Sequence, residues 1–386
     1  MQTCRFVKRV SISATNDLVT DQRVQRMIHT LRKDGIEVIL RGRKLRQSPP
    51  MPSTSYSYRR YRMLFSRGFL FYAFFNVRVF LALLFSRRPD LLIPVDLDTL
   101  PANYLAGRIR RIPILYDSHE FFTGLPELVH RKAIKKFWEF LERKIVPRLQ
   151  HAITVSPSIA SAYASRYGIS FSVIRNVPFR KDPVYDPEFA ERYPAGNRII
   201  YQGALNMGRG LEILIDSMEW IADTILFIAG DGDIRETLRL RVMEKELNSR
   251  VVFTGRYPPG ALHRLTSQCH LGVSLEEDLG LNYRMALPNK LFDYIQARIP
   301  VLCSDLPEMR RVVEEYEVGE VVRSRDAREL AGQLRGMLND RDRRLKWKRG
   351  LDVAAGELCW EQEEQLFREA VVKAFSGCGS QEGRSG

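Results

Sequence analysis

Short apolar runs alternate with amphipathic segments along almost the whole chain, and this alternation predicts the fold class. In the first half, apolar runs predict β-strands near residues 5–12, 37–41, 91–94, 114–116 and 152–155. Helical spacing of apolar positions predicts helices over residues 22–34 and 131–148. Because parallel strands need a crossover connection, usually a helix, the pattern predicts an α/β fold with parallel sheets.

The second half repeats the alternation. Strands are predicted near residues 198–202, 224–229, 251–254, 271–275 and 301–303. Helices are predicted over residues 211–218, 234–247 and 258–268. A chain of 386 residues is long enough for two domains of ordinary size.

The domain boundary is predicted where prolines and charges replace the alternating pattern. We expect a first domain over residues 1–180, a linker over 181–197 and a second domain over 198–359. A last helix is expected over 360–375. The segment 376–386, rich in Gly, Ser and charge, is expected to be disordered.

The segment 287–305 has the pattern of a turn, a helix and a buried strand. Pro288 and Asn289 predict a helix start in which the Asn side chain caps the first turn. Free N–H groups at such a start favour an anion, and Lys290 adds a cation there. Asp293, one turn on, supplies an acceptor of the kind that a ribose diol needs. These parts suit a diphosphate and a ribose.

Charge is distributed unevenly along the chain. Residues 1–180 hold 31 Lys and Arg against 12 Asp and Glu, a net of +19, whereas residues 181–386 hold 29 against 34, a net of −5. A strongly basic half indicates an anionic partner such as a membrane surface, a nucleic acid or a phosphorylated acceptor. The sequence has no basic motif interleaved with aromatic residues of the kind that binds nucleic acid, so we expect no nucleic-acid partner. The five scattered cysteines and a start without a secretory apolar core favour a cytoplasmic protein with reduced thiols.

One apolar segment in the basic half is of the kind that could contact a membrane. Residues 68–77 and 79–86 are apolar and are separated by Arg78, with arginines on both flanks. Neither piece reaches the roughly 18–20 residues that span a bilayer. The helix expected over 63–86 is therefore either a core helix or a helix that lies in the interface of an anionic membrane.

Several motifs in fixed order resemble family 4 of the glycosyltransferases, which have the GT-B fold. They are DLDTLP (96–101), DSHE (117–120), TVS (154–156), IYQGALNMGRGLE (200–212), LFIAGDG (226–232), VVFTG (251–255), LPNKLFDYIQARIPVLCSD (287–305) and WEQE (360–363). The resemblance covers nearly the whole chain. It implies two Rossmann-like, doubly wound domains that face each other across a cleft, with the C-terminal helix crossing back to the N-terminal domain.

The resemblance also implies which residues act. The candidate catalytic residues are His119, Arg209 and Lys290. The donor-binding residues are Gly203, Arg209, Gly232, Gly255, Arg256, Tyr257, Glu276, Glu277, Asn289, Lys290 and Asp293. The acceptor is expected to meet Asp17, Asp21, Arg23, Asp96 and Asp98. The chain departs from the family pattern at Ala204, where an arginine is usual, and at Asp293, where a glutamate is usual.

The implied reaction is retaining transfer of a sugar from a nucleotide-diphosphate sugar to an acceptor hydroxyl. The glycine-turn context of Asp231 and Asp233 argues against a metal motif, so no metal and no cofactor beyond the donor are expected. The expected acceptor is a lipid-linked glycan or a precursor of a surface polysaccharide, used at the inner face of the cell membrane. The alternatives are a sugar-nucleotide epimerase of the same fold and a non-catalytic scaffold that binds sugar nucleotides.

Overall fold

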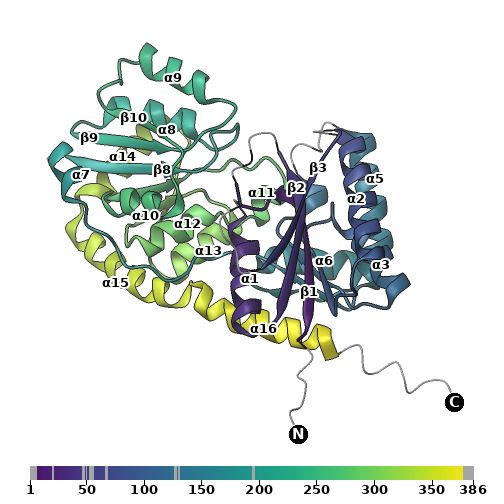
Figure 1. Cartoon of the computed structure of the whole chain (residues 1–386). Coiled ribbons are helices and arrows are strands. Elements are labelled where there is room, and N and C mark those ends of the chain that lie inside the picture. Colours follow the sequence, from purple (N-terminus) through teal and green to yellow (C-terminus); the bar gives the residue numbers. More distant parts are fainter. Residues whose placement is uncertain are drawn as a thin grey trace, which may run out of the picture. The chain divides into compact units, whose positions relative to one another are not determined.

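A computed structural model shows the chain as two compact units (Figure 1). The structure describes residues 7–376 except 20, 46, 47, 49, 52–55, 66, 67, 126, 127, 129, 130, 194 and 195. The N-terminal unit comprises Met1–Asn176 and Glu363–Gly386, and the C-terminal unit comprises Val177–Gln362. The expected disorder of 377–386 concerns residues outside the described ranges.

The N-terminal unit is built on parallel strands. They are β1 (Arg9–Asp17), β2 (Glu37–Lys44), β3 (Ser57–Arg62), β4 (Leu91–Pro94), β5 (Leu115–Ser118), β6 (His151–Thr154) and β7 (Ser172–Val173). They pair in the orders β3-β2-β1-β4 and β5-β6-β7. Two parallel bridges, Leu92 to Ile114 and Val95 to Asp117, join β4 to β5. The order therefore reverses between β1 and β4, which is where doubly wound sheets bind ligands.

Helices connect and cover these strands. They are α1 (Gln22–Lys33), α2 (Gly68–Phe85), α3 (Leu100–Arg110), η1 (Phe122–Gly124), α5 (Lys132–Ile145), η2 (Val146–Arg148) and α6 (Pro157–Tyr167). The amphipathic α1 buries Val24, Met27, Ile28 and Leu31 on one stripe, as the apolar spacing predicted. Strand β3 was not predicted, because its sequence SYRRYR is polar and its burial pattern is that of an edge strand.

The C-terminal unit contains a single parallel sheet in the described residues. Its strands are β8 (Asn197–Gln202), β9 (Thr224–Ala229), β10 (Val251–Gly255), β11 (Leu271–Ser274), β12 (Val301–Cys303) and β13 (Gly319–Val321). They pair in the order β10-β9-β8-β11-β12-β13. The chain moves outward from β8 in one direction and then returns to β11 at its other side. The switch point of this sheet is therefore the β8–β11 pair.

Helices connect the strands of this sheet. They are α7 (Pro187–Arg192), α8 (Leu211–Ser217), η3 (Met218–Trp220), α9 (Arg235–Glu244), α10 (Pro259–Ser267), α11 (Leu281–Met285), α12 (Asn289–Gln296), α13 (Pro307–Glu315), α14 (Ala327–Asn339) and α15 (Arg341–Glu357). Two apolar clusters of buried residues pack around the sheet, one including Phe292 and Ile295 of α12 and the other Leu211 and Leu214 of α8.

The last helix, α16 (Trp360–Ser376), belongs to both units by sequence. Trp360 is fully buried, and its N–H donates to the carbonyl of Pro178 in the C-terminal unit. From Glu363 onward the helix belongs to the N-terminal unit, where Glu363 accepts from the backbone of Arg175 and Arg368 pairs with Asp34. The chain thus returns to its first unit through the helix predicted over 360–375.

The segment 181–197 was predicted as a linker, and the structure corrects this. Its helix α7 places Phe189 and Tyr193 against Phe227 of β9, with ring centroids 5.3 Å and 5.0 Å away. Asp186 caps α7 by accepting from the N–H of Phe189. The proline-rich, charged composition did not reveal that these two aromatic residues pack on the C-terminal unit.

Candidate functional site

The candidate donor site lies at the carboxyl ends of the strands of the C-terminal sheet. Gly203 follows β8, Gly232 lies in the turn after β9, Gly255 ends β10 and Glu276 follows β11. Because parallel strands end at one edge of a sheet, residues that are far apart in sequence come together there. The edge includes the β8–β11 switch point, where the strongest polar cluster of this unit is found.

That cluster is built around the carboxylate of Glu276, whose side chain is 4% exposed. Lys290 Nζ lies 2.9 Å and Arg209 Nη1 3.6 Å from Glu276 Oε1. The hydroxyl of Ser274 donates to Oε2 at 2.7 Å. Burial by itself would raise the pKa of Glu276, but Lys290, followed by Ser274 and Arg209, lowers it below its usual value. The carboxylate is therefore ionised, and two cations share it.

Aromatic rings hold both cations in place. Lys290 Nζ stands 4.0 Å from the centroid of the Tyr201 ring, and the guanidinium of Arg209 stands 5.2 Å from that of Tyr283. Sequence reasoning missed both tyrosines, since tyrosines within a strand and a short helix give no sign of such a role. It also missed Arg325, which donates to the backbone carbonyl of Glu276 at 2.6 Å and so fixes that loop.

One polar atom of this cluster is left without a partner. In the described part of the chain, Arg209 Nε is buried and has no hydrogen-bond partner, while Lys290 Nζ and Glu276 Oε1 are paired with each other at 2.9 Å. Buried polar groups of proteins are normally satisfied, so the unpaired Nε beside two cations and one carboxylate indicates a place for a polar ligand.

Close backbone approach at this edge requires glycine. Gly230 has φ +155°, and a Cβ there would lie 1.8 Å from the carbonyl oxygen of Gly203. Gly210 has φ +67°, and a Cβ would lie 2.3 Å from the carbonyl oxygen of Leu275. The turns after β8 and β9 therefore pack tightly together, and the turn that carries Arg209 packs on the end of β11.

The start of α12 differs from the prediction. Asn289 was expected to cap the helix, but Pro288 is the capping residue, with φ −69° and ψ 136°, and no side chain caps the first turn. Asn289 is the first helical residue and is exposed. Because no side chain accepts from the first N–H groups, they remain available to an anion. The helix ends at Gln296.

The remaining donor candidates lie at the same edge with different partners. Gln202 donates to Asp293 Oδ2 at 2.8 Å. Asp231 pairs with Arg256 at 3.5 Å, and the backbone N–H of Glu277 donates to the carbonyl of Gly208. Tyr257 is 41% exposed just beyond β10. Among the described residues, no three His, Cys, Asp or Glu side chains are grouped so that they could share a metal ion.

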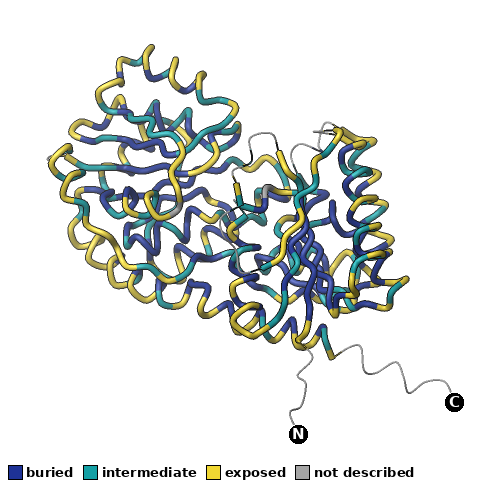
Figure 2. Tube along the Cα trace, viewed as in Figure 1, coloured by how far each residue is buried: buried dark blue, intermediate teal, exposed yellow. Residues whose placement is uncertain are grey.

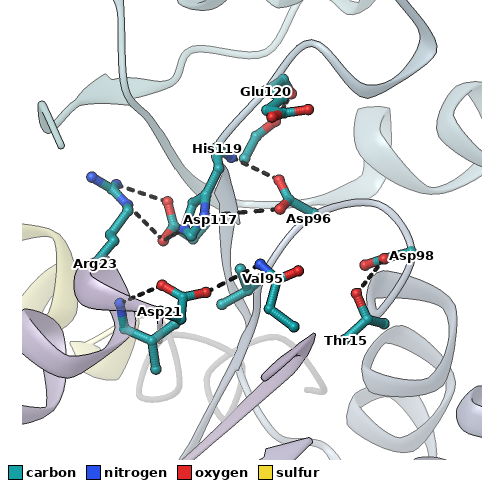
Figure 3. Close-up of polar contacts among 12 residues, drawn as sticks. Thr15, Asp21, Arg23, Val95, Asp96, Asp98, Asp117, His119 and Glu120 are labelled. Carbon is teal, nitrogen blue, oxygen red and sulfur yellow. Dashed lines mark hydrogen bonds and ion pairs between the residues drawn. The ribbon is translucent and has the colours of Figure 1, made fainter. Parts of the chain in front are cut away.

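The candidate acceptor site of the N-terminal unit is a chain of charged groups (Figure 3). Arg23 of α1 donates to both oxygens of Asp117, at 3.0 Å and 2.8 Å. His119 Nε2 lies 2.8 Å from Asp117 Oδ2, and the backbone N–H of His119 donates to Asp96 Oδ1 at 2.8 Å. The ring atom Nδ1 of His119 lies 3.8 Å from Asp96 Oδ2. One histidine therefore stands between two carboxylates.

The pKa values of this chain follow from burial and the fixed charges. Burial would raise the pKa of Asp117, but the charges of Arg23 and His119 hold it well below its usual range. Burial would lower the pKa of His119, but Asp117 and Asp96 raise it to about 9. Burial, which His119 only partly offsets, raises the pKa of Asp96 to about 8. At neutral pH the imidazole is protonated.

The other acceptor candidates have local partners. Asp98 Oδ2 accepts from the hydroxyl of Thr15 at 2.5 Å, while Oδ1 is buried without a partner in the described residues. Burial raises the pKa of Asp98 to about 7. Asp21 caps α1 by accepting from the N–H of Val24. The side chain of Asp17 lies outside the described part.

Arg23 was predicted to meet the acceptor, and its geometry gives it another task. The side chain is 1% exposed, and its guanidinium donates to Asp117 and, at 2.7 Å, to the carbonyl of Ile174. It holds Asp117, which in turn orients His119. The structure therefore gathers Asp96, Asp98 and His119 at one strand edge, with Arg23 behind them as a positioning residue.

The two units, each with a doubly wound parallel sheet, have the architecture of the GT-B fold. Two family models match it, glycosyltransferase family 4 over residues 21–178 and glycosyl transferases group 1 over residues 187–350. The chain belongs to family 4 of the glycosyltransferases. No curated protein sequence matches it.

Solved structures of low sequence identity share the fold. Sucrose-phosphate synthase of Thermosynechococcus elongatus superposes with a TM-score of 0.78 at 17% identity, covering 96% of this chain and 100% of that one. Anabaena HepE, solved in complex with UDP-glucose, has a TM-score of 0.75 at 14% identity, covering 95% and 99%. WaaG, a glycosyltransferase of lipopolysaccharide biosynthesis, has a TM-score of 0.68 at 13% identity, covering 92% and 99%.

Proposed function

We propose that this glycosyltransferase moves a hexose from a nucleotide-diphosphate sugar to a hydroxyl of a glycan acceptor, with retention of the anomeric configuration. The C-terminal unit binds the donor, and the N-terminal unit binds the acceptor. The observation that carries the proposal is the Glu276 cluster, in which Arg209 and Lys290 share one buried carboxylate and the buried Nε of Arg209 has no hydrogen-bond partner in the described residues. Anabaena HepE, which shares the fold, binds UDP-glucose, and this supports a nucleotide sugar as the donor.

The cations of the cluster have the task of stabilising the departing diphosphate. Lys290 is the second residue of α12, so its charge and the free N–H groups of the first turn act on the same region. Arg209 adds a planar guanidinium whose Nε has no partner in the described residues. Preorganised charges of this kind favour the state in which the leaving group gains negative charge. Asp293 accepts from the ribose, and the turns at Gly203 and Gly232 allow close approach of the phosphates.

His119 is the candidate catalytic residue of the N-terminal unit. Its ring is 13% exposed and, with a pKa of about 9, is protonated at neutral pH. A protonated ring donates to an oxygen that gains negative charge. Asp96 and Asp98 are placed to orient an acceptor hydroxyl, because both follow β4 and neither carboxyl group is taken up by an arginine at salt-bridge distance in the described part.

The test is an assay with purified full-length protein, a panel of UDP-, GDP- and ADP-sugars and a lipid extract. Release of nucleoside diphosphate together with a glycosylated product supports the proposal. The reaction is expected to continue in EDTA, because we assign the diphosphate charge to protein cations. Loss of turnover in EDTA that is restored by a divalent metal would refute that assignment.

The same assay separates the alternatives. Isomerisation of the donor sugar without an acceptor would establish an epimerase and overturn the proposal. Nucleotide-sugar binding without either product over the whole panel would establish a non-catalytic scaffold. The chain departs from the family pattern at Ala204 and Asp293, and the assay therefore has to test for binding without catalysis.

A further inference from the structure

One surface of the N-terminal unit, formed by α2, α3, α5 and the residues before α2, exposes large apolar side chains. We call it the three-helix face. Its members are Leu64, Phe65, Phe69, Leu70, Val77, Leu81, Phe85, Leu105, Ile109, Phe137 and Phe140, and their exposed fractions range from 37% to 83%. Figure 2 shows exposed positions along these helices. Exposed apolar side chains that are grouped on a protein surface, and not scattered singly, mark an interaction site.

The face is continuous between helices. The rings of Phe69 on α2 and Phe137 on α5 meet edge to face, with centroids 5.2 Å apart, although both remain exposed. Asn76 of α2 bonds the start of α3, donating to the carbonyl of Asp98 and accepting from the N–H of Ala102. Helices α2 and α3 therefore lie side by side, and their exposed apolar residues lie on neighbouring helices.

The opposite side of α2 is part of the core, which decides between the two interpretations of this helix. Phe75, Val79 and Leu83 are fully buried and pack with Leu92 of β4 and residues of α3. The helix has 18 residues with a mean hydropathy of 1.9, enough to cross a membrane by length and composition, but a crossing would remove this buried stripe from the domain. Arg78 in its middle donates to the carbonyl of Arg62. The helix is both a core helix and an exposed apolar surface.

The charges around the three-helix face have one dominant sign. Helices α2 and α3 carry three arginines and no acidic residue. Helix α5 carries five Lys and Arg against Glu139 and Glu142, and Glu142 is buried. An apolar surface bordered by cations is complementary to a membrane whose headgroups are anionic. A protein partner of matching shape would need no such excess of one charge.

We propose that the three-helix face docks on an anionic lipid bilayer, with its apolar side chains at the level of the headgroups and the first methylene groups. The exposed apolar residues enter the interface, and the surrounding Lys and Arg contact phosphate. A further consequence, which rests on the proposed function, is that the acceptor hydroxyl belongs to a lipid-anchored glycan held at the same membrane.

The test is co-sedimentation of the full-length protein with vesicles of phosphatidylcholine alone and with phosphatidylglycerol added. We expect binding to the anionic vesicles that weakens as salt rises, since screening shortens the range of the attraction. Binding that depends on neither lipid charge nor salt would overturn the proposed contact of Lys and Arg with the lipid phosphates. Absence of binding to either vesicle would overturn the proposal.

Matched variants locate the surface. Leu70→Gln with Leu81→Gln removes two apolar side chains that are 55% and 45% exposed, and we expect partition to fall about tenfold or more. Leu240→Gln with Met243→Gln changes two equally exposed residues of α9, at 58% and 61%, and should leave partition unchanged. Arg108→Gln with Lys136→Gln should lower binding to anionic vesicles about tenfold or more and leave any residual binding to phosphatidylcholine alone unchanged.

Two further readouts keep this proposal separate from the others. Nucleotide-sugar binding should be the same in all variants, so a failure of donor binding would count against the proposed function and not against the face. The oligomeric state is measured in the absence of lipid. A dimer that the Leu70→Gln, Leu81→Gln variant dissociates, together with no vesicle binding, would assign the face to a second copy and overturn the membrane proposal.

Discussion

The polar clusters of the two units both place an arginine and a second basic residue at one buried carboxylate. They differ in whether the arginine keeps a donor without a partner. In the C-terminal unit, Arg209 and Lys290 converge on Glu276, and the buried Nε of Arg209 has no hydrogen-bond partner in the described part. In the N-terminal unit, Arg23 and His119 converge on Asp117 with four polar contacts of 3.0 Å or less, counting the Ile174 carbonyl. The first arrangement leaves cations for a ligand. The second uses its arginine to fix a histidine.

The comparison teaches that a buried arginine–carboxylate pair has no single meaning. What distinguishes the two clusters is how many donors remain once the protein's own acceptors are satisfied. Arg23 is 1% exposed and donates to both oxygens of Asp117 and to the carbonyl of Ile174, whereas the buried Nε of Arg209 has no hydrogen-bond partner in the described residues. The variants below test this difference between the two clusters, in order of decreasing expected effect.

The largest effect is expected from Arg23→Met. The change leaves the fully buried Asp117 without its arginine, and removing one partner of a buried ion pair costs about 3–5 kcal/mol of unfolding free energy. Urea unfolding, with amide hydrogen exchange of α1 and β5 as the local probe, measures the loss. The control is Lys135→Met, which breaks a surface pair with Glu139 in the same unit and should cost at most about 1 kcal/mol. Equal losses in both variants would contradict a positioning role for Arg23.

Arg209→Ala should act on activity and leave the fold intact. Loss of a charge aimed at the leaving group is expected to lower turnover by roughly 10²–10³-fold and to weaken nucleotide binding. Steady-state kinetics and calorimetric titration with the nucleoside diphosphate measure the two effects. Arg239→Ala, on the exposed side of α9, is the matched control and should match the unchanged protein. Full activity of the Arg209 variant would show that the arginine does not act on the diphosphate.

The His119 chain predicts that the N-terminal unit loses stability as the pH rises. Because the pKa of His119 is raised from 6.5 to about 9, its stabilisation is fully present below pH 6.5 and is lost as the pH passes through about 9. The change amounts to roughly 3 kcal/mol. The raised pKa of Asp96, about 8, acts in the same direction, since its ionisation is disfavoured in the folded state.

Unfolding curves between pH 6 and pH 10 measure this dependence, and His119→Gln is the informative variant. The neutral side chain should reduce the slope above pH 6.5, leaving the part that is due to Asp96, while lowering stability at pH 6. A slope that is unchanged in the variant would show that the histidine does not carry the titration.

The smallest effect is expected from Asp293→Asn. We expect nucleotide binding to weaken about fivefold, since one hydrogen bond from the ribose is weakened and the contact from Gln202 is disturbed. The discriminating measurement compares ribonucleotides with their deoxyribose analogues. If Asp293 binds the diol, the analogues should bind both proteins alike. An equal loss for both ligands would mean that the residue acts through the fold of the site.

Much of the architecture was predictable from local pattern. Strands β4 and β9 begin and end where the apolar runs do, and α1 was placed to within one residue. The predicted linker was wrong because composition could not reveal that Phe189 and Tyr193 pack on β9. The predicted cap at Asn289 was wrong because the sequence Pro-Asn allows the turn to begin at either residue, and the extended conformation of Pro288 decided it.

The candidate sites were predicted as residues but not as contacts. The family resemblance named Arg209, Glu276 and Lys290 separately, and the structure brings them together. Tyr201, Tyr283 and Arg325 had no local pattern to mark them, because their importance comes from neighbours on other elements. Arg23 was assigned to the acceptor, since its position after β1 suited that task, and only its burial and its bonds to Asp117 corrected this.

The sequence by itself determined the α/β class, the order of strands and helices, the family and the uneven distribution of charge. Each depends on periodicity or on residues close together in the chain. Tertiary structure alone decided that two cations share Glu276 and that Arg23 belongs to Asp117. It also decided that α2 has one core side and one exposed apolar side. These depend on which side chains meet at the edge of a parallel sheet and on the surface of its helices, and local sequence spacing does not encode such long-range contacts.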